Sequence, residues 1–360
     1  MAGRVVVAMS GGVDSSVVAV MLKKQGYEVI GVTMQLYDYG EAVEAAKQKT
    51  CCASRDITDA QNVARQFGFL HYVLNYESVF KQEVMDKFAD DYLAGLTPIP
   101  CISCNQTVKF RDLYSFAKKL GANFLATGHY VKRVTDPSGH AYMHTAADLS
   151  KDQSYFLYST TIEQLQFLRF PLADQDKATT RKMAEDFGIK TFAKPDSQDI
   201  CFVPGGDYKS VVQKLRPEAI RHGNIVDIET GQTIGTHSGI VGYTIGQRRG
   251  IGLSSLQPKY VIKIDAPTNT IFVGERHHLL TDEVTVKDVN WLVPNHFDKT
   301  GEMFFRFRSS ANSTSQGKIV SVSENQVKIK LNHKALSITP GQACVFYQNS
   351  LVVGGGVITH

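Results

Sequence analysis

The first 130 residues alternate between short apolar runs and longer stretches in which apolar side chains recur at helical spacing. The first run, Val5–Met9, is rich in β-branched residues and predicts a buried strand. It breaks at a Ser-Gly-Gly sequence, and a helix follows that Gly26 is placed to end. The apolar face of that helix comprises Val17, Val18, Met21 and Leu22.

The same alternation continues to residue 127. Strands are expected at 28–34, 71–75 and 123–127, and helices at 56–67, 77–95 and 107–120. Strands that alternate with helices form a parallel, doubly wound sheet, which binds its ligands at the carboxyl ends of the strands. The polar residues 38–50 predict a mobile loop.

The pattern changes after about residue 205. Residues 217–275 are rich in Gly, Thr, Ile and Val, and from Leu280 onward apolar and polar residues alternate at strand period. Strands are expected at 284–289, 302–308, 317–322, 326–331 and 343–347. Five strands joined by short turns within about 80 residues predict a small β-barrel.

Length and composition set wider bounds on the protein. A chain of 360 residues has room for two or three domains. No apolar run approaches the roughly 20 residues of a membrane span, and the N-terminus does not resemble a signal peptide. We therefore expect a cytoplasmic protein with no membrane partner. The net charge of +4 favours an anionic partner only weakly.

The stretch Ser10–Ser15 lies between the first strand and the first helix. Its two glycines let the backbone approach an anion, and the helix N-terminus and the serine hydroxyls favour a phosphate. It lacks the lysine of a Walker loop and the spacing of a dinucleotide fingerprint. The alternative is an ordinary strand-to-helix turn. Met34 and Gly128 lie at the carboxyl ends of predicted strands and are candidates for binding a nucleotide, although Met34 also fits simple core packing.

Six cysteines in a chain expected in the cytoplasm indicate catalysis, metal binding or burial rather than structural disulfides. Cys101 and Cys104 form a Cys-x-x-Cys that we expect in a loop before a helix starting near Thr107, where thiolates are favoured. Cys201 lies in a polar, Gly-flanked stretch that predicts an exposed loop. Structural or incidental roles are expected for Cys51 and Cys52, and burial for Cys344.

Five motifs occur in a fixed order along the chain. They are Ser10–Ser15, Gly128-His129-Tyr130, Lys151–Leu157, Asp199–Phe202 and Tyr243–Gly250. The first resembles the pyrophosphate loop of enzymes that split ATP between its α and β phosphates. Together the five resemble the bacterial tRNA-specific 2-thiouridylases, which put sulfur on the wobble uridine. The resemblance covers nearly the whole chain.

This resemblance implies three domains. They are a doubly wound α/β pyrophosphate-loop domain at 1–205, a small linking domain at 206–277, and a C-terminal, tRNA-contacting β-barrel at 278–360. It implies that ATP adenylates the 2-carbonyl oxygen of the wobble uridine and that sulfur then displaces AMP. Mg²⁺ is expected to bridge the phosphates, with Asp14 as a ligand or an orienting group.

The resemblance also assigns residues. Nucleotide contacts fall on Ala8, Met9, Ser10, Gly11, Gly12, Val13, Asp14, Ser15, Met34 and Gly128. Contacts to tRNA fall on Ile99, Pro100 and Cys101 for the target base, and on His129, Lys151, Asp152, Gln153, Arg306, Phe307 and Gln342. The catalytic pair is Cys104 and Cys201: Cys201 carries a persulfide sulfur, and Cys104 assists its release and leaves a Cys104–Cys201 disulfide.

One position departs from the family pattern. Many members have Asn-Pro-Asp where this chain has Ile99-Pro100-Cys101. Cys101, Cys104 and Cys201 could therefore be three ligands of a [4Fe–4S] cluster whose fourth iron binds sulfide. Zinc is a lesser alternative, since a closed structural site needs a fourth protein ligand.

The basic side chains expected on the RNA-binding surface are Lys151, Arg248, Arg249, Arg306 and Arg308. The alternation in Arg306-Phe307-Arg308 predicts that its two arginines share one strand face. His129 is expected to contact ATP or RNA, or else to be a buried histidine. Replacing Asp152 by alanine is expected to weaken thiolation without unfolding the protein.

The expected partners are tRNAs, from the resemblance those for Lys, Glu and Gln, and a sulfur donor such as a cysteine desulfurase or a sulfur-relay protein. A monomer is expected. Two other functions fit part of the sequence. One is a pyrophosphate-loop synthetase or amidotransferase that acts on a small molecule, and the other is a redox-sensing cluster on an RNA-binding scaffold. The first gives no reason for Cys104 and Cys201.

Overall fold

The computed structural model describes residues 2–359 except 38–51, 196–199, 254–256, 295–297, 299–300, 311–313 and 337. The predicted loop at 38–50 and Cys51 therefore lie outside the described residues. Contacts divide the chain into two compact units, which are considered separately below. The first comprises Met1–Val84, Cys101–Gln198 and Ser350–Val352, and the second Met85–Pro100, Asp199–Asn349 and Val353–His360. The three-domain division with boundaries at 205 and 277 stays a prediction.

A five-stranded sheet forms the first unit's core. Its strands are β1 (Ala2–Ala8), β2 (Tyr27–Gln35), β3 (Leu70–Asn75), β4 (Phe124–Ala126) and β7 (Leu168–Arg169). Their order is β3-β2-β1-β4-β7, and each neighbouring pair is parallel. The predicted doubly wound parallel sheet is confirmed. The strand order reverses at β1: the chain runs from β1 outward through β2 and β3 on one side, and then returns to β4 on the other side. Sheets of this kind bind their ligands at such a switch point.

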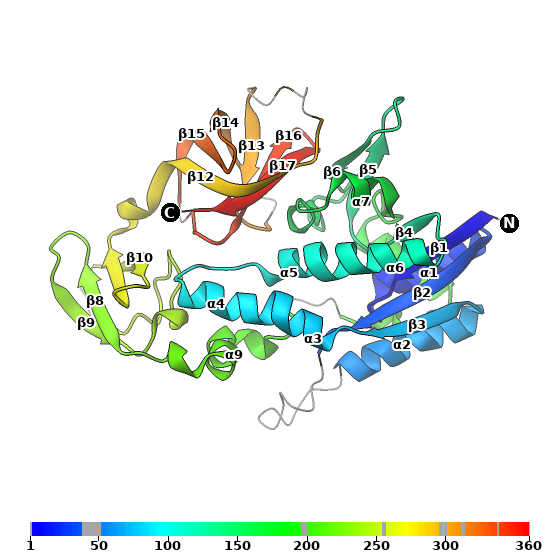
Figure 1. The fold of residues 1–360 in the computed structure, drawn as a ribbon, viewed down its shortest axis with the longest axis horizontal. Helices are drawn as coiled ribbons and strands as arrows, with labels where there is room; N and C mark the ends of the chain where they lie inside the picture. The colour runs from blue at the N-terminus through cyan, green and yellow to red at the C-terminus, as the bar shows by residue number, and fades with distance from the viewer. Residues whose placement is uncertain are drawn as a thin grey trace. The chain divides into compact units, whose positions relative to one another are not determined.

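The helices of this unit pack along the sheet and on each other. They include α1 (Val13–Lys24), α2 (Cys52–Phe67), α6 (Leu113–Lys119), α7 (Ile162–Phe167) and α8 (Lys177–Asp186). Helix α2 runs along β2 and β3 (Figure 1). Helix α1 contacts both α2 and α8, so Ala19 and Val20 are fully buried together with Val17 and Val18. The prediction of a single apolar face on α1 is therefore incomplete, because a second layer of helix covers its other side.

The end of α1 agrees with the sequence prediction, whereas two later helices differ from it. Gly26 takes φ +87° and its N–H donates to the Lys23 carbonyl at 3.0 Å, so it ends α1 as predicted. The predicted helix 77–95 is α3 (Glu77–Phe80), a π-helical segment (Lys81–Asp86) and α4 (Lys87–Leu93). The helix predicted at 107–120 starts earlier, with α5 (Pro100–Ser103) and a π-helical segment (Cys104–Asp112) before α6. Proline favours the first turn of a helix, and this explains the earlier start.

The remaining elements of the first unit follow β4. An antiparallel hairpin is formed by β5 (Val131–Thr135) and β6 (Ala141–Thr145). Short 3₁₀ segments lie at Ser154–Phe156 and Lys190–Ala193. Among the described residues, no helix combines the length and apolar character that crossing a bilayer requires.

The second unit contains a small four-stranded sheet. Its strands are β8 (Gly223–Asp227), β9 (Thr233–His237), β10 (Tyr260–Asp265) and β11 (Thr270–Gly274), in the order β10-β11-β8-β9. Helix α9 (Tyr208–Leu215) precedes the sheet. Ile225, Val261, Ile271 and Val273 are fully buried in its apolar core. This small sheet is the linking domain that the resemblance implies.

The C-terminal strands close into a barrel. They are β12 (Leu280–Trp291), β13 (Met303–Arg306), β14 (Thr314–Val322), β15 (Gln326–Leu336), β16 (Ala343–Gln348) and β17 (Leu351–Ile358). Their order is β12-β15-β14-β13-β16-β17, and a further β12–β17 pairing closes the ring. The predicted small barrel is confirmed. Cys344 is fully buried in it, as predicted, and burial raises the pKa of its thiol.

Candidate functional site

The loop between β1 and α1 requires glycine at Gly11. Its φ is +70°, and a Cβ there would overlap the carbonyl oxygen of Asp56. Gly12 is the N-cap of α1 and no side chain caps it. The N–H groups of the first turn of α1, with the helix dipole, are therefore suited to an anion.

Serine hydroxyls fix the shape of this loop. The N–H of Ser10 donates to Ser15 Oγ at 3.1 Å, and the Ser16 hydroxyl donates to the Gly12 carbonyl at 2.8 Å. Ser15 and Ser16 are buried, whereas Ser10 is exposed. Of the two serines expected to meet phosphate, Ser10 is therefore the exposed one.

The other predicted nucleotide contacts lie on the same edge of the sheet. A Cβ at Gly128 would lie 2.8 Å from the Ser15 nitrogen and 3.0 Å from the Asp14 carbonyl carbon, so the chain after β4 packs directly on the first turn of α1. Met34 is half-buried near the carboxyl end of β2. The remaining loop residues follow β1 in sequence: Ala8 ends it, Met9 is buried and donates its N–H to the Val32 carbonyl at 2.8 Å, and Val13 begins α1.

Asp14 is bound by a cation that the sequence motif does not contain. Lys177 Nζ, in the first turn of α8, lies 2.8 Å from both carboxylate oxygens of Asp14. The Tyr130 hydroxyl donates to Asp14 Oδ1 at 2.9 Å, and the Thr180 hydroxyl lies 3.0 Å from the same Tyr130 oxygen. The side chains of Lys177 and Asp14 are 15% and 28% exposed, so water only partly screens the pair.

A second lysine holds the loop from its other side. Lys194 Nζ donates to the Gly11 carbonyl at 3.1 Å and pairs with Asp56 and, at 2.9 Å, with Asp59. Burial lowers the pKa of Lys194, but its hydrogen bonds to the two carboxylates outweigh this, and its pKa is raised. The lysine therefore stays charged and fixes Gly11 against α2.

Sequence reasoning missed both lysines. Each lies more than 160 residues after the loop, in stretches whose polar composition gave no local signal. The one indication of them was that the loop itself contains no lysine, unlike a Walker loop. A cation that balances phosphate charge here must therefore come from another part of the chain.

Cys101 and Cys104 lie within a helix rather than before one. Cys101 is in α5 and is exposed, and Cys104 begins the π-helical segment and is buried. Surrounding protein raises the pKa of both thiols, while Lys109 acts in the opposite direction on each. The predictions of a loop position and of a favoured thiolate are thus wrong, because desolvation by neighbouring atoms disfavours the charged thiolate more than Lys109 favours it.

Cys201 belongs to the second unit, where it is exposed in a turn after residue 200. Exposure agrees with the sequence prediction. The polar residues Ser197 to Asp199, which precede Ile200, lie outside the described residues. The meeting of Cys201 with Cys101 and Cys104 stays a prediction.

His129 follows Gly128 directly and its ring is neutral. Burial lowers the pKa of His129 to about 3, and Lys109 acts in the same direction. Its Nδ1 lies 2.9 Å from the Thr127 hydroxyl, and the ring meets Phe110 edge-on with centroids 6.0 Å apart. A contact of His129 with ATP or RNA would therefore be a hydrogen bond or a stack and not an ion pair.

Asp152, a predicted tRNA contact, is buried and engaged in its own turn. Its Oδ1 accepts from the Ala146 N–H at 3.0 Å, and its Oδ2 accepts from the Ser154 hydroxyl at 2.7 Å. The neighbouring Gln153 accepts from the Tyr130 N–H at 3.0 Å, and Lys151 is half-buried. The carboxylate of Asp152 therefore holds the backbone, and its loss should destabilise the fold, contrary to the sequence expectation.

The predicted tRNA contacts in the second unit differ in how far their side chains are buried. Arg306 is buried at the end of β13, with its guanidinium 4.3 Å from the ring centre of Tyr347, and Phe307 is also buried. Because β13 ends at Arg306, the exposed Arg308 lies beyond the strand, and the predicted shared face of the two arginines is wrong. Arg248 and Arg249 are exposed.

Gln342 contacts the segment that leads to Ile99 and Pro100. Its Nε2 donates to the Thr97 carbonyl at 2.8 Å, and the Thr97 N–H donates to the Pro340 carbonyl at 2.9 Å. The turn before β16 thus fixes the backbone two residues ahead of Ile99.

Comparison with known proteins adds independent findings. Family models match three consecutive parts of the chain: the tRNA methyl transferase HUP domain at residues 3–205, the tRNA methyl transferase PRC-barrel domain at 209–275, and the aminomethyltransferase beta-barrel domain at 281–358. A 4-thiouridine synthetase solved with RNA and ATP matches at 19% identity and a TM-score of 0.37, covering 60% of this chain and 51% of that one, which is too weak to carry an argument.

Curated relatives match over almost the whole length. The chain is 51% identical over 358 residues to the tRNA-specific 2-thiouridylase MnmA of Rickettsia prowazekii, covering 99% of this chain and 98% of that protein. It is 52% identical over 362 residues to the protein of the same name from Paracoccus denitrificans, covering 99% and 92%.

Proposed function

This chain belongs to the family of tRNA-specific 2-thiouridylases, and from that premise we propose how its own residues carry the reaction. The enzyme is an ATP-dependent tRNA sulfurtransferase that makes 2-thiouridine. The carbonyl at position 2 of uracil is a poor electrophile because oxide is a poor leaving group. Adenylation converts that oxygen into part of AMP, which leaves readily.

The first step takes place at the loop between β1 and α1. The 2-carbonyl oxygen of uracil attacks the α-phosphorus of ATP, and the bond to the β-phosphate breaks as pyrophosphate leaves with the bonding electrons. The observation that best supports this site is the bidentate pairing of Lys177 with Asp14 beside the uncapped N-terminus of α1. We assign Lys177 to the charge that develops on the departing pyrophosphate. Lys194 positions the loop through the Gly11 carbonyl.

Mg²⁺ would enter with the phosphates of ATP. Both oxygens of Asp14 already accept from Lys177, so Asp14 fits the role of an orienting group better than that of a direct metal ligand. The ion, when bound, neutralises phosphate charge. Lys177 and the α1 amides would hold the opposite side of the pyrophosphate.

The second step transfers sulfur. A donor of the cysteine desulfurase or sulfur-relay class would place a sulfur on Cys201 as a persulfide. Its terminal sulfur attacks C2 of the adenylated base, and the C2–O bond breaks as AMP leaves. Cys104, as the thiolate, then attacks the Sγ of Cys201, and the S–S bond breaks with its electrons left on the sulfur of the base. A Cys104–Cys201 disulfide remains, which an external dithiol must reduce.

A [4Fe–4S] cluster is the alternative sulfur carrier. The thiols of Cys101 and Cys104 are one helical turn apart; desolvation raises the pKa of both, and Cys101 raises the pKa of Cys104 further. A cationic cluster would hold both as thiolates, so the donor chemistry fits. Cys101, Cys104 and Cys201 would be its ligands, and when bound it would present sulfide to the adenylated carbon.

The substrate is proposed to be the wobble uridine of the tRNAs for Lys, Glu and Gln. That base must leave the anticodon stack to reach the loop. Ile99 and Pro100 are assigned to the target base, on a segment that Gln342 fixes through Thr97. The exposed Arg248, Arg249 and Arg308 are assigned to phosphates. A monomer in the cytoplasm is proposed.

The decisive experiment is thiolation of unmodified tRNA under anaerobic conditions. Enzyme, ATP and a sulfur source are incubated with and without iron, and digested RNA is analysed for 2-thiouridine. We expect one AMP and one pyrophosphate for each thiolated base. Hydrolysis of ATP to ADP and phosphate would refute the adenylation step, and full activity of iron-free enzyme would refute the cluster.

A further inference from the structure

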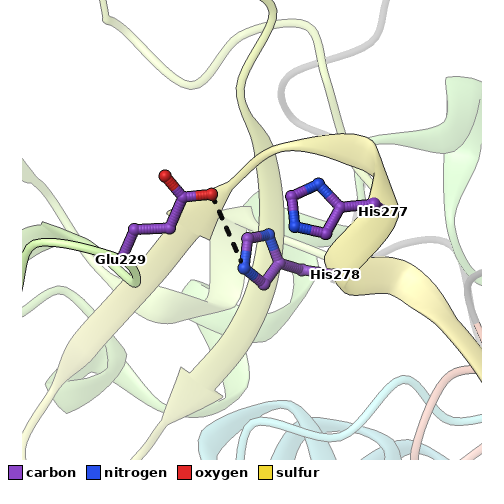
Figure 2. A group of neighbouring side chains, drawn as sticks. All are labelled: Glu229, His277 and His278. Carbon is purple, nitrogen blue, oxygen red and sulfur yellow. Dashed lines mark ion pairs between the residues drawn. The ribbon is translucent and has the colours of Figure 1, made fainter.

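Glu229, His277 and His278 come together in the second unit, and none of the three belongs to a motif that the proposed function uses (Figure 2). One ligand atom from each lies within 4.8 Å of those of the other two. Glu229 follows β8, and the two histidines lie in a 3₁₀ segment, Arg276–Leu279, that follows β11. Since β8 and β11 are parallel neighbours, the two segments leave the sheet at the same edge.

The backbone on both sides of this cluster is fixed. The Glu229 N–H donates to Asp227 Oδ1 at 3.0 Å, and the His278 N–H donates to the Glu275 carbonyl at 3.2 Å. The ring of His278 packs against Gly274, where a Cβ would lie 3.2 Å from His278 Nδ1. That nitrogen is buried and has no hydrogen-bond partner among the described residues. The other ring nitrogen, Nε2, is therefore the one that faces Glu229.

The spacing between His278 and Glu229 suits a bridging ion. His278 Nε2 lies 3.6 Å from Glu229 Oε1, which is too long for a hydrogen bond. Two ligands that are each about 2.1 Å from a tetrahedral zinc ion are about 3.4 Å apart. The observed gap is thus close to the separation that a shared ion imposes.

His277 supplies the third ligand. Its ring centre lies 3.9 Å from that of His278, and its side chain is 61% exposed, so a small rotation can bring a nitrogen to the ion. Its Nδ1 lies 3.5 Å from Glu275 Oε2, which leaves Nε2 to bind the ion. A carboxylate behind a metal-binding histidine is a common means of orienting the ring.

The charges and donor types select the ion. Glu229 and Glu275 make the cluster acidic, and Lys259, whose ammonium group experiences both carboxylates, is already paired with Asp227 at 2.7 Å. Two imidazoles and one carboxylate suit zinc and its transition-metal neighbours, whereas Mg²⁺ and Ca²⁺ prefer oxygen ligands. We propose that Glu229, His277 and His278 form a site for one divalent transition-metal ion of the zinc class, with Glu275 orienting His277.

The ion would join the β8–β9 turn to the segment that enters the barrel. His278 is two residues before Leu280, the first residue of β12. A metal at this place ties the entry of β12 to the small sheet and restricts the segment between them. Its role is therefore structural and is independent of the sulfur chemistry.

The test uses the untagged full-length chain, because a histidine tag binds the same ions. Thiolates bind zinc more tightly than imidazoles do, so Cys51, Cys52, Cys101, Cys104 and Cys201 are replaced by serine. Zn²⁺ is titrated by calorimetry, and Co²⁺ is followed by its visible absorption. We expect one ion per chain and a Co²⁺ spectrum without a thiolate charge-transfer band. Wild-type protein with alkylated thiols gives a second measurement if the serine variant does not fold.

Single substitutions assign the ligands. His277→Ala and Glu229→Gln change exposed side chains, and each should weaken Zn²⁺ binding at least tenfold, with a loss of about tenfold for Glu275→Gln. His222→Ala and His333→Ala, at exposed histidines outside the cluster, serve as controls and should leave binding unchanged. Zn²⁺ should raise the melting temperature only when the cluster is intact. The proposal would be overturned if Zn²⁺ binding did not saturate, if binding were unchanged in His277→Ala and Glu229→Gln, or if the controls lost binding equally. None of these outcomes would bear on the proposed thiolation reaction.

Discussion

Replacement of Lys177 by methionine is the sharpest test of the adenylation site. Lys177 Nζ lies 2.8 Å from both oxygens of Asp14, and the two side chains are 15% and 28% exposed. An exposed ion pair contributes up to about 1 kcal/mol, and breaking a buried one costs about 3–5 kcal/mol. We expect an intermediate loss of about 1–2 kcal/mol in the free energy of unfolding, because the Tyr130 hydroxyl still donates to Asp14.

The effect on the reaction should be much larger. If Lys177 meets the departing pyrophosphate, its loss removes a charge-stabilising group from the transition state and should slow adenylation about 10²–10³-fold. The assay is the release of AMP and pyrophosphate in a single turnover with unmodified tRNA, together with 2-thiouridine in the digested RNA. Lys177→Arg, which keeps the charge, should recover part of the rate.

The same helix supplies a matched control. Lys182 pairs with Glu185 and Asp186 on the exposed face of α8, so Lys182→Met should leave the rate unchanged. The double variant Asp14→Asn, Lys177→Met separates two roles for the lysine. Recovery of the rate would mean that Lys177 only neutralises Asp14. A folded Lys177→Met enzyme that releases pyrophosphate within about threefold of the wild-type rate would refute the assignment.

Four further outcomes are expected. Gly128→Ala should raise the KM for ATP, because the new methyl group pushes the chain after β4 off α1; an unchanged KM in a folded variant would contradict this. Lys109→Met should raise the pKa of Cys104 further and move the pH profile of single-turnover sulfur release to higher pH. An unchanged profile would mean that Lys109 does not influence the ionisation of that thiol. His129 has a pKa of about 3 in the fold, which is below its unfolded value, so its contribution to stability is complete above about pH 6.5 and falls as the pH is lowered. At pH 5 the protein should have lost about 2 kcal/mol of unfolding free energy through this group. Urea unfolding of His129→Gln should show a smaller loss of unfolding free energy between pH 7 and pH 5. Asp152→Ala should lower the free energy of unfolding by about 2–4 kcal/mol, measured by urea denaturation, and a variant of normal stability would mean that its hydrogen bonds are dispensable.

Local pattern predicted the architecture well. The alternation of short β-branched runs with helical stretches predicted the parallel sheet, because a strand buried on both faces must be apolar along its whole length. Strand-period alternation after residue 280 predicted the barrel for a related reason, since one face of each strand is buried and the other is wet. The strand β7 was missed because it has only two residues.

Other errors came from contacts that no local pattern encodes. Helix α8 was not predicted, because only Thr180 and Ala184 are buried along it and its sequence shows almost no apolar face. The helix that carries Cys101 and Cys104 begins at Pro100, earlier than the predicted start near Thr107, because proline suits the first turn of a helix. Desolvation by the surrounding protein then reversed the expected direction of the pKa shift of both thiols.

The sequence by itself determined where the loop lies and what backbone conformation it takes. Gly11 must be glycine and the helix that follows must present its N-terminus, since both follow from the backbone conformation of six consecutive residues. Only the tertiary structure decided which cations serve that loop. Lys177 and Lys194 both lie more than 160 residues after the loop. Lys177 reaches it because α8 packs on α1, and Lys194 reaches it because the 3₁₀ segment before it contacts both helices. The sequence around each lysine does not encode these contacts.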